Sequence, residues 1–455
     1  MTPNPGRGRD ALAANPVLEP SMNIPFTRHT LANGLSVILH EDHACPIVAV
    51  NVWYHVGSKN EVPGRTGFAH LFEHLMFEGS AHHDKGYFHP LQEAGALLNG
   101  STNADRTNYW EVVPTSAFEL ALWMESDRMG HLLPALTTAK FDNQRDVVLN
   151  ERRQNYENRP YGLATMATVA ALYPPEHPYH WLTIGSADDL RASTLEEARA
   201  FFETYYHPAN ASLSIAGDIA SDEALDCIVA HFGDLPGGPA VAPVRRQASL
   251  PAPVRLVHED RVELPRIYLA WHSPAMYAPG DAELDLVADV LSNGKNSRLY
   301  RSLVYTRRVA TEVAAFQNSR ELGSFFQVIA TAAPGHTLAD LEVAISEELA
   351  ALVAEGPTDD ELERSLAQAE AQFVYRLQTV GGFGGKSDQL NAYNVFLGEP
   401  GYFDRDLARY QRATRDDVRR QAQLHLDPVR RVTLSVVPAG QRTLAVPDSE
   451  PVVVQ

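Results

Sequence analysis

The chain repeats itself at a spacing close to half its length. The segment Leu39-His40-Glu41-Asp42 returns as Val257-His258-Glu259-Asp260, and Trp53 returns as Trp271, each 218 positions later. The repeat predicts two halves that share one scaffold, each a domain with its own packed layers.

The two halves also end alike. In each, a threonine begins a predicted helix that leads to a proline and then to a short strand. These are Thr194, Pro208 and residues 212–215 in the first half, and Thr414, Pro428 and residues 433–436 in the second. Between the halves, residues 235–254 hold five prolines and two glycines, a composition typical of a linker.

We therefore predict an α+β chain of two homologous α/β-sandwich domains, each a mostly antiparallel sheet with helices packed on it. The predicted domains are residues 23–234 and 255–455, joined by the linker at 235–254. Residues 1–22 are rich in Pro, Gly and Ala, and we expect them to form a flexible tail.

Composition excludes several classes of protein. The 455 residues are 44% hydrophobic, enough for two or more cores, and the net charge of −19 argues against binding nucleic acid or an anionic membrane. Two cysteines, Cys45 and Cys227, provide no disulfide framework. No apolar run is long enough to span a bilayer, and residues 1–22 have no signal-peptide core. We expect a cytoplasmic protein, or a periplasmic one if a signal peptide has been removed.

The pentapeptide His70-Leu71-Phe72-Glu73-His74 carries the strongest chemical signal. On a helix, residues i and i+4 share one face, so both imidazoles can reach one metal ion. Glu73 lies three residues after His70, near enough to approach a metal-bound water. This is the equipment for metal-assisted hydrolysis. Thr66 is the expected N-cap and Gly79 the expected end of this largely apolar, buried helix.

His-x-x-Glu-His is the inverzincin signature, and the chain resembles the pitrilysin-type (M16) family of zinc peptidases, which includes mitochondrial processing peptidases and bacterial homologues. The resemblance implies a zinc cofactor and a third ligand far downstream. Glu151, with 76 residues between it and His74, stands in a segment similar to the family's. Val147, Val148 and Glu151 also share one helical face, so an acid interrupts an apolar stripe. Glu157 is the alternative ligand, although it falls off that face.

One position departs from the family pattern. Gln144 lies two turns before Glu151, where relatives often carry another glutamate. An amide there can still hydrogen-bond a ligand, but it removes a charge that would tune zinc affinity or the acidity of the bound water.

The resemblance implies further site residues. Arg298 and Tyr305, two helical turns apart, match an Arg and a Tyr that face the scissile bond from the half without the zinc motif. Asn99 and Gly100 match an edge strand that holds substrate by main-chain pairing. The alternative at Asn99-Gly100 is an ordinary hairpin turn.

Together these features predict a zinc endopeptidase that hydrolyses peptides or unfolded segments inside a closed chamber, with Glu73 as the base. Projecting the repeat onto the second half finds no His or Glu near residues 288–292, so that half keeps only the scaffold. In the family, two such chains form a clamshell. We expect a homodimer, or a heterodimer with a related zinc-free subunit; the alternative function is a non-catalytic or partner-dependent subunit.

Two other segments are interpreted as loops. Residues 381–387 resemble a phosphate-binding loop, but the required first glycine is Val380 and a helix precedes them, so a helix connection is favoured. His82, His83 and His89 follow the predicted zinc helix in a polar segment. We expect these histidines to be exposed rather than to form a second metal site.

Overall fold

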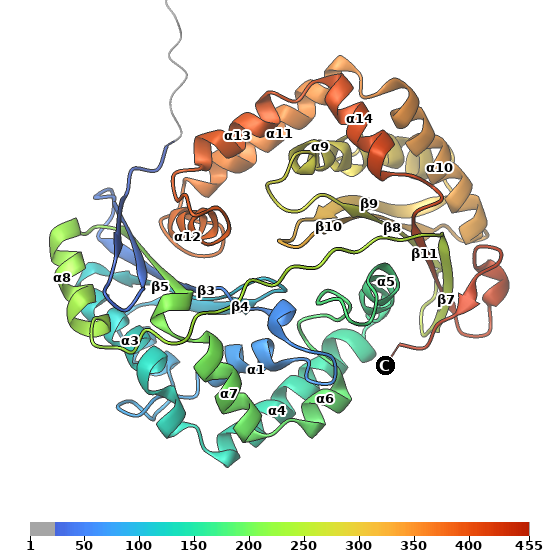
Figure 1. The fold of residues 1–455 in the computed structure, drawn as a ribbon. Coiled ribbons are helices and arrows are strands. Elements are labelled where there is room, and N and C mark those ends of the chain that lie inside the picture. The colour runs from blue at the N-terminus through green and yellow to red at the C-terminus, as the bar shows by residue number, and fades with distance from the viewer. Residues whose placement is uncertain (1–22, 455) are drawn as a thin grey trace, which may run out of the picture.

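A computed structural model describes residues 23–454; the predicted tail at 1–22 lies outside this range. The fold is α+β, with two six-stranded sheets, each covered by helices, and the fold-class prediction is confirmed (Figure 1). The predicted linker runs between the two sheets, and residues 236–253 form neither helix nor strand.

The first sheet has the strand order β1-β2-β6-β3-β5-β4. Only β2 and β6 pair in parallel; the other neighbours are antiparallel. The strands are β1 Thr27–Thr30, β2 Ser36–Glu41, β3 Ile47–Tyr54, β4 Leu97–Thr102, β5 Thr107–Pro114 and β6 Ala211–Gly217. Strand β4 therefore lies at an edge of the sheet.

The second sheet has the order β12-β7-β11-β8-β10-β9, and all of its strands except the edge strand β12 match the first sheet. β12 comes from the C-terminal end and pairs in parallel with β7, whereas β1 pairs antiparallel with β2. The parallel pair β7–β11 corresponds to β2–β6, and the repeated tryptophans Trp53 and Trp271 lie in the equivalent strands β3 and β8. The strands are β7 Val254–Asp260, β8 Arg266–Ser273, β9 Ala310–Asn318, β10 Ser324–Ala332, β11 Val432–Pro438 and β12 Glu450–Pro451.

Helices cover the sheets and carry the candidate site. The first half contains α1 Phe68–Leu75, α2 Phe88–Glu93, α3 Phe118–Ala135, α4 Thr138–Arg152, α5 Ala164–Leu172, α6 Ala187–Ala192, α7 Leu195–Tyr205 and α8 Ser221–Phe232. The second half contains α9 Asp281–Ser292, α10 Leu338–Glu355, α11 Asp359–Arg376, α12 Lys386–Leu397, α13 Phe403–Gln411 and α14 Arg415–His425. Thr194 and Thr414 cap α7 and α14 through reciprocal capping boxes, which confirms both predicted helix starts.

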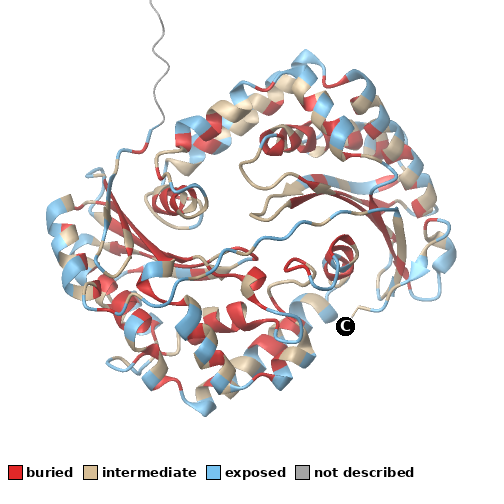
Figure 2. Ribbon diagram, viewed as in Figure 1, coloured by how far each residue is buried: buried red, intermediate tan, exposed pale blue. Residues whose placement is uncertain are grey.

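Each half also lends one helix to the other half. Helix α12 packs against β3 and β6 of the first sheet, and α5 packs against β8 and β11 of the second (Figure 1). Both helices contain several buried residues, coloured red in Figure 2. The loop before α12 makes the close approach possible, because a Cβ atom at Gly381 would lie 2.6 Å from the side chains of Ala49 and Val112. Residues 381–385 form the predicted connection between helices, and residues 386–387 already belong to α12.

Candidate active site

Helix α1 is fixed in place by burial and by an unexpected cap. Phe68, Ala69, Leu71, Phe72 and Leu75 are buried, so the helix is held in the first core. The prediction that Thr66 is the N-cap is wrong, because the Thr66 hydroxyl and N–H groups donate to Asp189 instead.

The N-cap is instead Gly67, whose φ of +94° favours glycine. The buried Glu61 carboxylate accepts hydrogen bonds from Gly67 N at 3.0 Å and Ala69 N at 2.9 Å, so it satisfies N–H groups at the start of the helix. The helix also ends at Leu75, four residues before the expected Gly79.

His70 and His74 point from α1 toward Glu151 near the end of α4. The Nε2 atoms of His70 and His74 lie 3.7 and 3.4 Å from Oε2 of Glu151. One potential ligand atom from each residue lies within 4.8 Å of the others. The structure thus brings together the three residues that the sequence predicted as ligands.

This arrangement fits a zinc ion by distance and by donor type. Two ligand atoms at about 2.0–2.2 Å from zinc, at a tetrahedral angle, lie roughly 3.4 Å apart, close to both separations above. Burial lowers the pKa of His70, and the hydrogen bond with His74 lowers the pKa of Glu151. Both shifts favour the neutral imidazole and the ionised carboxylate that bind zinc.

The other ring nitrogen of His70 departs from the usual pattern. A metal-binding imidazole commonly donates this N–H to an acceptor, which fixes its orientation. His70 Nδ1 is buried and, within residues 23–454, makes no hydrogen bond. Packing of α1, rather than a hydrogen bond, therefore orients this ring.

Glu73 lies on the half-buried side of α1, between the two histidines in sequence. Its charge acts on His70 and on the half-buried Arg106 of the β4–β5 hairpin. A carboxylate one turn from a metal-binding histidine can act as a general base toward a water at the cluster.

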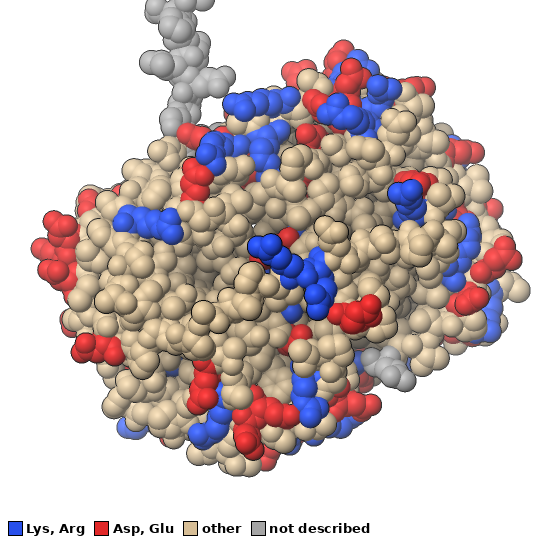
Figure 3. Space-filling view, in the orientation of Figure 1, with Lys and Arg blue, Asp and Glu red and all other residues tan. Residues whose placement is uncertain are grey.

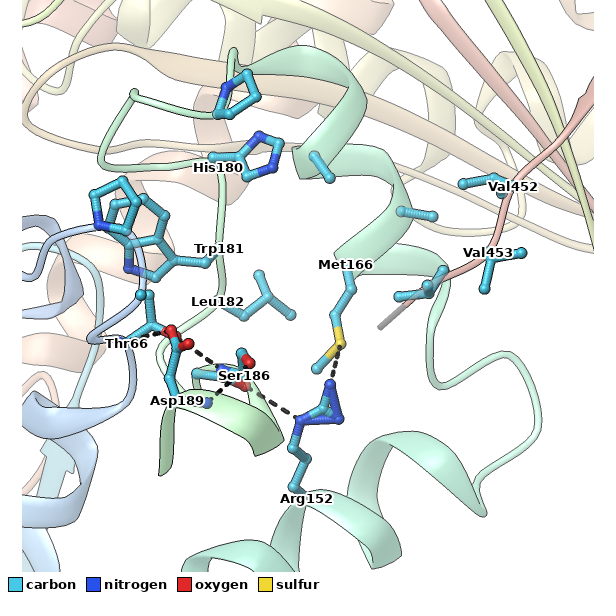
Figure 4. Close-up of a pocket in the computed structure, with 17 residues that line it drawn as sticks. Thr66, Arg152, Met166, His180, Trp181, Leu182, Ser186, Asp189, Val452 and Val453 are labelled. Carbon is cyan, nitrogen blue, oxygen red and sulfur yellow. Dashed lines mark hydrogen bonds between the residues drawn. The ribbon is translucent and has the colours of Figure 1, made fainter. Parts of the chain in front are cut away.

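The residue after Glu151 anchors the end of α4. The Arg152 side chain is buried; it donates from Nε to Gly185 O at 3.2 Å and from Nη1 to Glu157 at 2.7 Å. Arg152 and Met166 line a cavity of about 420 Å³; in Figure 4, Thr66 and Trp181 lie at the left of the view and Val452 and Val453 at the right. The cavity lies beside the cluster and does not include it.

Two sequence expectations near Glu151 have a clear outcome. Glu157, the alternative ligand, is paired with Arg152. Gln144 donates its amide to Glu78, in the turn that follows α1, and not to a residue of the cluster. The amide thereby ties α4 to the segment that follows the histidines.

Asn99 and Gly100 lie in the edge strand β4, which packs against α1. They pair with Trp110 and Tyr109 of β5, and the hairpin turn falls later, at Asn103 to Arg106. The hairpin alternative for Asn99-Gly100 is therefore wrong. The Asn99 side chain is exposed, and its Oδ1 accepts from Gly100 N at 2.8 Å.

Arg298 and Tyr305 do not join the cluster within one chain. The Arg298 guanidinium donates to both oxygens of Glu361 at 2.8 and 2.6 Å and to Gly356 O at 2.8 Å. Tyr305 is 76% exposed, on an irregular helical turn at Tyr300–Thr306. All partners of Arg298 are in the second half of the chain.

Sequence reasoning missed two residues that support the site. Glu61 was overlooked because its partners are backbone N–H groups, which leave no spacing signal. Asp388, on α12, accepts hydrogen bonds from Trp53, Asn51 and Asn108 of the first sheet. Its only signal is an acidic residue just after a glycine-rich loop.

Known proteins are similar to this chain in sequence. The profile of the insulinase family, peptidase family M16, matches residues 36–176, and that of the peptidase M16 inactive domain matches residues 192–369. The zinc protease PqqE of Helicobacter pylori is 30% identical over 356 residues, covering 77% of this chain and 80% of that protein. A probable mitochondrial-processing peptidase subunit beta of Arabidopsis thaliana is 24% identical over 377 residues, covering 78% and 68%.

Solved structures of other proteins have the same fold as this chain. A protease from Helicobacter pylori superposes with a TM-score of 0.84 at 26% identity, covering 91% of this chain and all of that one. A peptidase M16 inactive domain from Pseudomonas fluorescens, at 19% identity, shares the fold with a TM-score of 0.81, covering 94% and 100%. The chain belongs to peptidase family M16.

Proposed function

We propose that this chain is a zinc-dependent endopeptidase in which His70, His74 and Glu151 hold the metal ion and Glu73 is the general base. The observation that carries the proposal is the convergence of both Nε2 atoms on one oxygen of Glu151, at 3.4 and 3.7 Å. When bound, zinc would act as a Lewis acid and lower the pKa of a water ligand to about 7.

The chain's own residues perform the proton transfers. Glu73 takes a proton from a water molecule as the water oxygen attacks the peptide carbonyl carbon. Glu73 then delivers this proton to the departing amine when the C–N bond breaks. The free edge of β4 at Asn99 and Gly100 suits an extended peptide that adds as a further strand. Main-chain pairing of this kind binds unfolded segments with little dependence on sequence.

The surroundings suit a peptide substrate better than nucleic acid or lipid. On the face shown in Figure 3, most of the surface is neither basic nor acidic, and the scattered Lys and Arg form no broad cationic surface. In residues 23–454 no helix is both long and apolar enough to cross a membrane.

Assembly supplies what one chain lacks. Because Tyr305 is exposed and Arg298 is engaged in the second half, we infer that they act on a peptide held by another subunit's cluster. The partner is a second copy of this chain or a related zinc-free subunit. Light scattering during size-exclusion chromatography should find two copies per particle; monomers that cleave peptide at full rate would exclude this assembly.

The deciding experiment compares the wild-type chain with Glu73→Gln. We expect both proteins to bind one zinc ion at the cluster, with cleavage of a quenched peptide library about 10²–10⁴-fold slower in the variant. Loss of zinc from the variant, or equal cleavage by both proteins, would refute the role of Glu73.

A second candidate function is supported by the engagement of Arg298 with Glu361. In it, the chain binds zinc but requires a partner subunit to cleave, or serves as a non-catalytic subunit. Stoichiometric zinc without cleavage of any peptide, alone or with added subunit, would favour this function.

A further inference from the structure

The segment that follows α1 is fastened to the middle of α3. Ala81 N donates to His131 O at 2.9 Å, His82 N donates to Asp127 Oδ2 at 3.3 Å, and Ser80 Oγ donates to the same carboxylate. These bonds hold His82 beside two side chains that are 45 and 49 positions away in sequence.

Asp127 and His131 are four residues apart on α3, the same spacing as His70 and His74 on α1. His131 itself departs from helical geometry, at φ −135° and ψ 21°, where the segment docks on its carbonyl group. His82, Asp127 and His131 each offer a ligand atom, and these atoms lie within 4.8 Å of one another.

The donor set is chemically suited to a borderline divalent cation. It holds two imidazoles, whose ring centres are 4.8 Å apart, and one carboxylate. The Asp127 side chain is only 4% exposed, so its charge lies in an environment that favours a bound cation. Burial acts to raise the pKa of Asp127, but hydrogen bonds from Ser80 and His82 outweigh it and lower the pKa.

One carboxylate oxygen is oriented and the other faces the histidine. Oδ2 accepts from Ser80 and from His82 N, while Oδ1 lies 2.5 Å from His82 Nδ1. A cation can replace the proton between Oδ1 and Nδ1 if this pair widens from 2.5 Å to roughly 3.4 Å, the separation of two ligand atoms that each lie about 2.0–2.2 Å from zinc. Ser80 would keep the carboxylate oriented as the proton leaves.

We propose that His82, Asp127 and His131 form a second zinc site, separate from the His70, His74 and Glu151 cluster. The site clamps the segment after α1 onto α3 and so stiffens the connection from the histidine helix to the edge strand β4. The sequence suggested only exposed histidines here, because Asp127 and His131 are far from His82 along the chain. The His82 side chain is 60% exposed, as expected.

Another group of possible ligands serves as an internal comparison. Glu119, Cys227 and His231 also approach one another on α3 and α8. Glu119 is 79% exposed, and no buried carboxylate orients this group. Zinc binding there would not depend on His82.

The test counts zinc ions on the full chain after chelator treatment and dialysis against micromolar zinc, using mass spectrometry of metals and calorimetric titration. We expect two equivalents for the wild-type chain and one for His82→Ala. We expect one for His70→Ala/His74→Ala and none for the triple variant. His89→Ala, which removes another exposed histidine of the same region, should retain two.

A second readout guards against misfolding of a variant. In the His70→Ala/His74→Ala background, zinc should raise the melting temperature, and His82→Ala should abolish this rise without changing the circular dichroism spectrum. Any of three results would overturn the second site. The His82→Ala variant could still bind two zinc ions, or the wild-type chain could bind the second ion only at millimolar zinc. Alternatively, Cys227→Ser rather than His82→Ala could lose the second ion. None of these outcomes depends on peptide cleavage, so the proposed endopeptidase stands or fails separately.

Discussion

The three side chains of the histidine cluster differ in exposure and in charge. The side chains of His70, His74 and Glu151 are 12%, 23% and 33% exposed. The most buried member, His70, has a lowered pKa and is neutral near pH 7, whereas the most accessible member supplies the negative charge. The cluster therefore directs two imidazole nitrogens and one carboxylate oxygen toward a single point.

Removing the anionic ligand should separate metal binding from folding. We expect Glu151→Gln to weaken zinc binding by at least about 100-fold, more than the loss of an outer hydrogen-bond partner, because one of three direct ligands is lost. Glu157→Gln is the matched control, since Glu157 is on the next turn and pairs with Arg152. Competition with a zinc-binding dye measures both affinities. Similar affinities for the two variants would contradict the ligand assignment.

Single residues also show where sequence reasoning was sufficient and where it was not. His70 and His74 were predictable because both lie on one helix, where spacing fixes geometry. Glu151 could be paired with them only through the family resemblance. The engagement of Arg298 with Glu361 was not predictable, because their contact depends on how α11 packs, 63 positions further along the chain.

At the level of elements, α1 depends on a buried acid that lies outside it. Glu61 accepts hydrogen bonds from the backbone N–H groups of the N-cap Gly67 and of Ala69 in α1, and from Trp181 Nε1 at 3.0 Å. Burial nevertheless dominates and raises the pKa of Glu61 to about 8. The helix that carries both histidines is thus coupled to a titrating group with a pKa near physiological pH.

This coupling has a defined sign. A carboxyl group whose pKa rises from 4.5 to about 8 on folding binds an extra proton in the folded state between these values. Stability from this group is complete below pH 4.5 and falls as pH rises toward 8, by up to about 1.4 kcal/mol per pH unit.

Glu61→Gln should therefore flatten the decline in the free energy of unfolding between pH 5 and 8, as measured by chemical denaturation. Glu203→Gln, on the exposed side of α7, should keep the wild-type slope. A difference between wild type and Glu61→Gln that stays constant across this range would show that Glu61 keeps an ordinary pKa.

At the level of the whole molecule, the halves are joined more intimately than a linker implies. The repeat predicted the two equivalent sheets, because each copy carries the same strand pattern. It could not predict that α5 and α12 cross to the opposite sheets, since an apolar helix face does not specify which sheet will cover it. The exchange makes each core depend on the other half.

A buried polar junction completes this join. Lys59 of the first half is 3% exposed and pairs with Glu321 of the second, which also accepts from His55 Nε2 at 2.8 Å. Burial acts to raise the pKa of Glu321, but the hydrogen bond from His55 and the Lys59 charge outweigh it and lower the pKa to about 2. Asp105 Oδ1, 3.7 Å from Lys59 Nζ, is the remaining acid nearby.

Glu321→Gln should lower the free energy of unfolding at pH 7 by about 3 kcal/mol, because a buried lysine loses its main counterion while Asp105 remains. Glu399→Gln, which breaks the exposed pair with Arg405, should cost no more than about 1 kcal/mol. A carboxyl group whose pKa is depressed on folding stabilises above pH 4.5 and loses this effect as pH falls toward 2. Denaturation at pH 7 and pH 3 should therefore show the gap between wild type and Glu321→Gln shrinking in acid, whereas an equal gap at both values would mean that the junction is held by packing alone.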